Sequence, residues 1–120
     1  MDISKYQKDH FVIMEQLRLL ASMSTKPLEY LQEIPPLLSS ASAKLKVHVV
    51  TEEATVYYGL SILSDEKITN LSGRMYDEIM TLASKWDDYV NKWHSPERIK
   101  ASPQSFTIET EEITHKIRER

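Results

Sequence analysis

The sequence contains no cysteine among its 120 residues. This absence excludes a disulfide-stapled scaffold, a thiolate zinc site and a cysteine nucleophile. Any metal site must therefore be built from histidine and carboxylate ligands, which suit iron, manganese or zinc better than copper(I).

Long apolar runs are also missing, because no stretch approaches the roughly 20 residues that span a bilayer. The first residues, Met1 to Lys5, lack the apolar segment of a signal peptide. No polybasic run appears and the formal net charge is -3, so nucleic acid is not an expected partner. We therefore expect no membrane contact and a cytoplasmic location.

Common enzyme motifs are absent as well. The chain has no Gly-x-Ser-x-Gly, no phosphate-binding glycine loop and no His-Glu-x-x-His. A hydrolase or acyl-transferase has little support, and we expect a binding or sensing protein in preference to an enzyme.

Helix-breaking residues are few and clustered. Only two glycines occur, and the five prolines are Pro27, Pro35, Pro36, Pro96 and Pro103. The stretches between them have helical periodicity and predict helices at about 4–24, 36–63, 65–94 and 103–120. Asp65 and Ser102 suit N-caps, while Pro36 and Pro103 suit first helical turns. Four helices with short links predict an all-α, up-down-up-down four-helix bundle, a single domain over residues 1–120.

Each predicted helix has one inward face. In chain order these faces comprise Tyr6, His10, Ile13, Leu17 and Leu20; Leu38, Ala41, Leu45, His48, Glu52 and Val56; Ile68, Leu71, Met75, Glu78, Leu82, Trp86, Tyr89 and Trp93; and Phe106, Thr110, Ile113 and Ile117. The residues that could carry chemistry are His10, His48, Glu52 and Glu78. Glu52 follows His48 by one helical turn, so both would lie on one face.

These four side chains are predicted to lie at one height. Counting from the predicted turns at about 1.5 Å per residue places them in one layer, within about a turn. Buried unpaired charge costs several kcal/mol, adjacent carboxylates repel, and no Lys or Arg lies on these faces to neutralise them. A divalent or dinuclear metal centre would resolve the problem, so we favour it over a metal-free polar layer.

The other histidines have simpler interpretations. His94 precedes Ser95-Pro96 at a helix end, where we expect it to cap carbonyl groups. His115 lies off the inward face and is expected in solvent. The aromatic residues Trp86, Tyr89 and Trp93 are expected in the core, or on an exposed dimer face if the fourth helix is short.

Two segments carry a recognisable pattern: Lys8-Asp9-His10, and His48-Val49-Val50-Thr51-Glu52-Glu53 followed by Val56-Tyr57. They resemble the two signatures of the hemerythrin-like (HHE cation-binding) family. Tyr76-Asp77-Glu78-Ile79-Met80, followed by Tyr89-Val90 and Trp93, is similar to a bacterial branch with a glutamate in the third helix. Phe106 and Glu109-Thr110 resemble the start of that branch's last helix, so the resemblance covers nearly the whole chain.

The resemblance implies a non-haem iron centre, di-iron or with another divalent metal. Its ligands would be His10, His48, Glu52 and Glu78, with Glu53 as a further carboxylate at or near the metal. The implied roles are oxygen binding, oxygen, redox or nitric oxide sensing, and iron or oxygen handling, with dioxygen or nitric oxide as the small ligand. Oxygen carriers have a His-x-x-x-His pair in the third helix, and a carboxylate in its place favours redox chemistry or sensing.

The fourth helix is a second departure from the family. The family's ligand there stands in an Arg-Ile-x-x-Glu segment, and the matching arginine is Arg120, the last residue of the sequence. We therefore expect a short or truncated fourth helix and a site that is incomplete, or completed by a second chain in a homodimer. Glu119 could replace the missing fourth-helix ligand, but a fraying chain terminus positions a ligand badly. The alternative function is a metal-free helical interaction or regulatory module that acts through dimerisation or partner binding.

Overall fold

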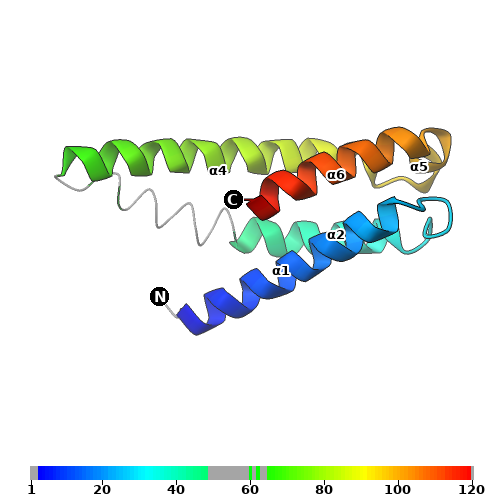
Figure 1. Cartoon of the computed structure of the whole chain (residues 1–120), viewed down its shortest axis with the longest axis horizontal. Coiled ribbons are helices and arrows are strands. Elements are labelled where there is room, and N and C mark those ends of the chain that lie inside the picture. The colour runs from blue at the N-terminus through cyan, green and yellow to red at the C-terminus, as the bar shows by residue number, and fades with distance from the viewer. Residues whose placement is uncertain (1–2, 49–59, 61, 63–64, 120) are drawn as a thin grey trace.

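The structure, a computed structural model, describes residues 3–48, 60, 62 and 65–119. These residues form helices and turns without any strand, which confirms the all-α class. Figure 1 shows the arrangement of the elements, which are α1 (Ile3–Ser24), α2 (Ile34–Leu45), α4 (Glu66–Trp93), α5 (Pro96–Ala101) and α6 (Pro103–Glu119).

Most helix boundaries lie close to the predicted ones. Helices α1, α4 and α6 begin and end within two residues of the predictions. Helix α2 begins two residues early, and its α-helical part ends at Leu45, where a wider π turn covers residues 46–48. The predicted continuation of this helix over 49–59 lies outside the described residues. The short helix α5 was not predicted, because six residues between two prolines carry too little periodicity to identify.

Local chemistry explains where the helices begin. The Asp65 carboxylate accepts hydrogen bonds from the backbone N–H of Lys67 and Ile68, at 3.0 and 3.2 Å, and so caps α4 as predicted. Proline lies in the first turn of α2 and opens α6, where its missing N–H costs nothing.

The helices pack in a closed ring of neighbours. Helix α1 contacts α2 and α6, α4 contacts the same two helices, and α5 joins the ends of α4 and α6. In Figure 1, α1 and α4 run in one direction while α2 and α6 return in the other. The Thr107 hydroxyl ties the start of α6 to α1 by donating to the Ser24 carbonyl oxygen. None of the helices among the described residues is long and apolar enough to cross a membrane.

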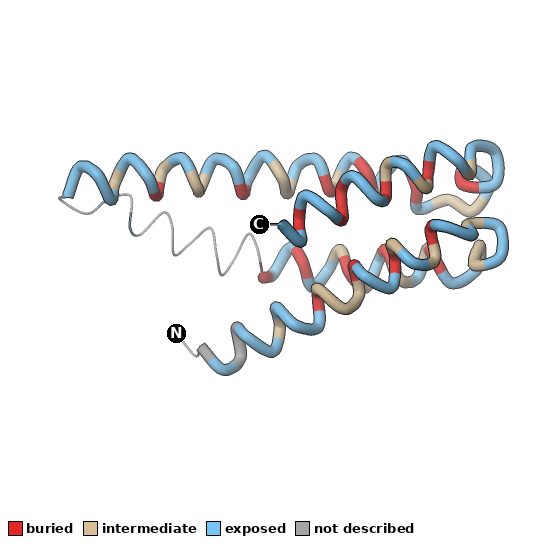
Figure 2. Tube along the Cα trace, viewed as in Figure 1, coloured by how far each residue is buried: buried red, intermediate tan, exposed pale blue. Residues whose placement is uncertain are grey.

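The buried residues line the inner side of this ring (Figure 2). The predicted inward faces of α1 and α6 are confirmed at Ile13, Leu17 and Leu20, and at Phe106, Thr110, Ile113 and Ile117. Trp86, Tyr89 and Trp93 are also buried, so they belong to the core and do not form a dimer face.

The first half of α4 differs from the prediction. Ser72 and Ile79 are buried there, whereas Ile68, Leu71 and Glu78 are exposed. The buried positions 72, 79, 86 and 93 recur every seven residues, which is the spacing kept by helices that coil around their partners. The predicted positions 71 and 78 are also seven residues apart, but each lies one residue before a buried position, so the prediction slipped by one residue in this half. This slip moved Glu78 from the inner face to solvent.

Candidate metal centre

Two of the predicted ligands lie together. The Nδ1 atom of His10 on α1 is 3.4 Å from the Nε2 atom of His48, and the ring centroids are 5.4 Å apart. The His48 side chain is 2% exposed, while His10 lies at the more open edge of α1. The two residues are 38 apart in sequence, so the packing of α1 on α2 brings them into contact.

The end of α2 determines the position of His48. Leu38, Ala41 and Leu45 are the preceding buried positions of this helix, and His48 continues their line. A π turn, which is wider than an α-helical turn, covers residues 46–48 and so includes His48 itself. Such turns are frequent at functional sites. The Nζ atom of Lys46, in the same turn, lies 3.4 Å from the Asp87 carboxylate of α4.

The spacing of the two nitrogen atoms is compatible with a shared metal ion. Two imidazole nitrogens bound to one tetrahedral ion at about 2.0–2.1 Å would lie about 3.4 Å apart. The observed separation is 3.4 Å. An octahedral ion with ligands at right angles would need about 3.0 Å, a small adjustment. The same distance also fits a long hydrogen bond between one protonated and one unprotonated nitrogen.

The predicted carboxylates do not complete the pair within the described part of the chain. Glu52 and Glu53, together with Val56 and Tyr57, lie outside the described residues, as does the Tyr6 side chain. Glu78 is exposed on α4, and its neighbour Ile79 occupies the buried position. Over residues 3–48 and 65–119, no group of three or more His, Asp or Glu side chains is close enough to hold one ion.

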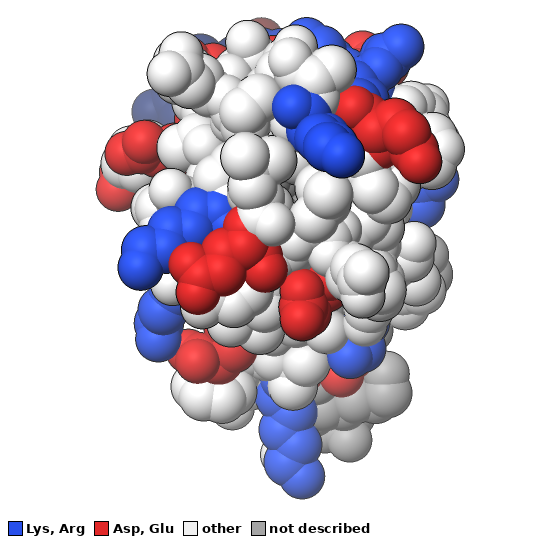
Figure 3. All heavy atoms as spheres, turned by 90° about the vertical axis from the view of Figure 1, so that its right-hand side faces the viewer, with Lys and Arg blue, Asp and Glu red and all other residues white. Residues whose placement is uncertain are grey.

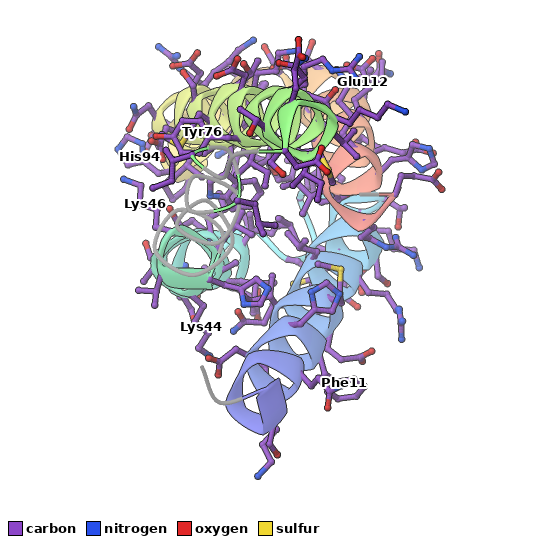
Figure 4. The ribbon with its side chains drawn as sticks, turned by 90° about the vertical axis from the view of Figure 1, so that its left-hand side faces the viewer. Phe11, Lys44, Lys46, Tyr76, His94 and Glu112 are labelled. Atoms are coloured by element: carbon purple, nitrogen blue, oxygen red, sulfur yellow. The ribbon has the colours of Figure 1, made fainter. Side chains whose placement is uncertain are left out.

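A cleft beside His48 was not predicted from the sequence. It lies between α1 and α2, has a volume of about 530 Å³, and is lined by Asp9, Val12, Ile13, Ala43, Lys44, Val47 and His48. In Figure 4, Lys44 projects from α2 at this end of the molecule. One sign of this cleft is visible in the sequence: Val12 and Val47 are apolar, yet both lie outside the predicted inward faces. The cleft places open space beside the buried His48.

The remaining histidines have the expected surroundings. His94 ends α4, and its Nδ1 atom lies 3.1 Å from the Asn91 carbonyl oxygen. His115 is exposed, with its Nε2 atom 3.8 Å from the Glu119 carboxylate. Neither histidine belongs to the His10–His48 pair.

A separate polar cluster joins α4 to α6. The Tyr89 hydroxyl lies 2.6 Å from Thr110 Oγ1 inside the core, and burial raises the pKa of this phenol, with a smaller contribution from the nearby Glu109 charge. Glu109 accepts hydrogen bonds from Trp93 Nε1 at 3.2 Å and Lys92 Nζ at 2.8 Å. These groups satisfy one another, which indicates a structural role.

The chain was compared with protein-family models, curated proteins and solved structures. None of the three comparisons finds a match.

Proposed function

We propose that this chain is a hemerythrin-like four-helix bundle that binds non-haem iron, acting in oxygen, redox or nitric oxide sensing or in iron and oxygen handling. The observation that carries the proposal is the 3.4 Å approach of His10 Nδ1 to His48 Nε2. Two imidazoles from different helices, one of them buried, are a common basis for a metal site in a helical bundle. The proposal places the protein in the cytoplasm.

The contacts among the helices support the bundle. Each of α1, α2, α4 and α6 packs against two of the others, and their directions alternate along the chain. In bundles of this topology, cofactor sites lie between facing helices. The His10–His48 pair has that position between α1 and α2.

The proposed ligands differ in their support. His10 and His48 have suitable geometry, whereas Glu52 and Glu53 are proposed from their sequence spacing after His48. Glu78 is the least supported because it is exposed. Bound iron would supply a coordination position for dioxygen or nitric oxide. The chain's own part is to hold the ion through unprotonated imidazoles and to shield it with the core around His48.

A second candidate is a metal-free interaction module. It is favoured by the absence of a three-ligand group among residues 3–48 and 65–119. In that case the two rings would be joined by a hydrogen bond and would specify how α1 packs on α2.

The test is iron content after anaerobic loading with ferrous ion and removal of the excess. His10→Ala and His48→Ala should each lower the iron bound per chain at least about tenfold, because each removes one of few ligands. His115→Ala removes an exposed histidine from α6 and should leave iron content unchanged. Loss of iron in Glu52→Gln, Glu53→Gln or Glu78→Gln would assign that carboxylate as a ligand. Equal iron in the two histidine variants and the control would exclude the site.

A further inference from the structure

Helix α4 carries an apolar row that continues past the end of α6. Its members recur every seven residues toward the start of the helix, with one more beside the last two; they are Tyr89, Leu82, Met75, Ile68 and Leu71. Tyr89 is buried, while Leu82 and Met75 are half-buried. Ile68 and Leu71 are 42% and 53% exposed. The row thus loses burial toward the N-terminal half of α4, which extends past α6 in Figure 1.

The end of α6 determines where this row becomes exposed. Tyr89 bonds Thr110, and α4 and α6 run in opposite directions. Counting from that contact, with the same rise in both helices, places Glu119 at the end of α6 beside about position 80 of α4. The apolar row therefore continues beyond α6 over residues 66–80, a length of about 22 Å. A further helix antiparallel to α4 would extend the contact that α6 begins.

The charges beside this row suit a second copy of α4. Lys67 and Glu78 are exposed, and neither side chain forms an ion pair with the described residues. They are separated by about 16 Å along the helix, too far to pair with each other. In an antiparallel pair that sets Leu71 of one copy against Met75 of the other, each Lys67 lies within about one residue of the level of the other copy's Glu78. A twofold axis produces this contact twice.

The helix ends agree with the same register. The last turn of α6 carries Lys116 and Arg118, whereas α4 begins with Asp65 and Glu66. Setting Leu71 against Met75 brings the start of the second α4 to about position 80 of the first, just past the end of α6. An acidic helix start then meets a basic helix end, and the backbone partial charges of the two ends are opposite as well.

We propose that two copies of this chain associate through the N-terminal halves of α4, antiparallel to each other, with Ile68, Leu71 and Met75 of both copies packed together. Lys67 of each copy pairs with Glu78 of the other. The second α4 takes the place in the bundle that α6 leaves open. A contact about 22 Å long and one helix wide is small for a protein interface, so the dimer is reversible and concentration-dependent.

Charge reversal in two separate chains tests the register. Lys67→Glu places two anions at each contact and Glu78→Lys places two cations there, so each variant alone should dimerise at least about tenfold more weakly than the unchanged chain. Mixing the two variants in equal amounts restores opposite charges at both contacts. The mixture should recover a species of twice the 14.0 kDa chain mass. The measurement is sedimentation velocity on each variant, on the mixture and on the unchanged chain.

A substitution in the apolar row tests the packing. Leu71→Lys places a charge within the contact and should leave the chain monomeric. Leu28→Lys is its matched control, because Leu28 is 57% exposed in the connection between α1 and α2. Glu29→Lys in that connection and Lys100→Glu on α5 are the matched charge reversals. The connection and α5 lie at the opposite end of the molecule, where basic and acidic side chains lie next to one another (Figure 3), so the controls should dimerise normally. Circular dichroism establishes that each variant is folded.

Three results would overturn this interface. They are an unchanged chain that stays monomeric at every soluble concentration, a Leu71→Lys chain that dimerises as strongly as the unchanged one, and a mixture that dimerises no better than either charge variant. The readout is mass, so the outcome does not depend on whether iron binds, and running each sample with and without a chelator separates the two questions.

Discussion

Tyr89 brings a hydroxyl into the core between α4 and α6. Its oxygen lies 2.6 Å from Thr110 Oγ1, and the aromatic rings of Trp86 and Phe106 lie nearby. The pair satisfies two polar groups that would otherwise be costly to bury. Because the core favours the neutral phenol, the pKa of Tyr89 lies above its usual value.

This burial predicts a loss of stability in alkali. Below about pH 10 the phenol is protonated in both the folded and the unfolded chain, so its contribution is constant. Above about pH 10 the unfolded chain releases the proton while the folded chain keeps it. The free energy of unfolding then falls by about 1.4 kcal/mol per pH unit from this group. Urea unfolding at rising pH should show a shallower decline in Tyr89→Phe than in the unchanged chain.

A second tyrosine provides the control for that comparison. Tyr30 is half-buried in the connection between α1 and α2. Tyr30→Phe removes a phenolic hydroxyl outside the Tyr89–Thr110 pair and serves as the matched substitution. Equal slopes for the unchanged chain and Tyr89→Phe would contradict the raised pKa of the buried phenol.

At the scale of the element, α4 depends on its first turn. It has 28 residues, and Asp65 caps its N-terminus through two backbone hydrogen bonds. Figure 1 shows that its N-terminal half extends past the end of α6. In this half Ile68 and Leu71 are exposed. The cap therefore stabilises the start of α4.

Removing the cap should lower the free energy of unfolding. Asp65→Ala leaves the N–H groups of Lys67 and Ile68 without their partner and should cost about 1 kcal/mol in urea unfolding. Asp65→Asn should retain most of the stability because the amide oxygen also accepts. Asp77→Ala, an exposed substitution within the same helix, should change stability by less than about 0.5 kcal/mol. A similar cost at positions 65 and 77 would contradict the capping role.

The elements show which parts of the structure are encoded locally. Proline positions, the Asp65 cap and apolar periodicity predicted α1, α4 and α6, because each signal acts within one helix. Which face of α4 is inward depends on the partner helices, and the prediction placed Glu78 inside where Ile79 is buried. His10 and His48 were predicted to meet by counting residues from one turn, and they do. The α1–α2 cleft depends on how far two helices diverge, which periodicity does not report.

At the scale of the whole molecule, one apolar core holds the helices together. Ile13, Leu17 and Leu20 of α1 lie in the same cluster as Leu38 of α2 and Phe106 of α6. The described side chains of α1 before Ile13 are exposed or half-buried, and the His10–His48 pair lies there. The folding of this core is what brings the two histidines together.

Two leucines on α1, one buried and one exposed, test how much the core contributes to the free energy of unfolding. Leu17→Ala leaves a cavity at a fully buried position and should lower the free energy of unfolding by about 2–5 kcal/mol. Leu19→Ala removes the same atoms from an exposed position and should cost less than about 1 kcal/mol. The measurement is urea unfolding followed by circular dichroism. Equal costs would mean that α1 does not pack through the face of Leu17.

The proposed iron centre is tested most directly by the metal content of the unchanged chain. The protein would be purified without chelators, loaded with ferrous ion, exposed to air, and measured for iron and for its ultraviolet-visible spectrum. The proposal predicts about two irons per chain and an oxo-to-iron absorption band that is lost in His48→Ala. A chain that holds no metal and shows no band would contradict the proposal and favour a metal-free interaction module.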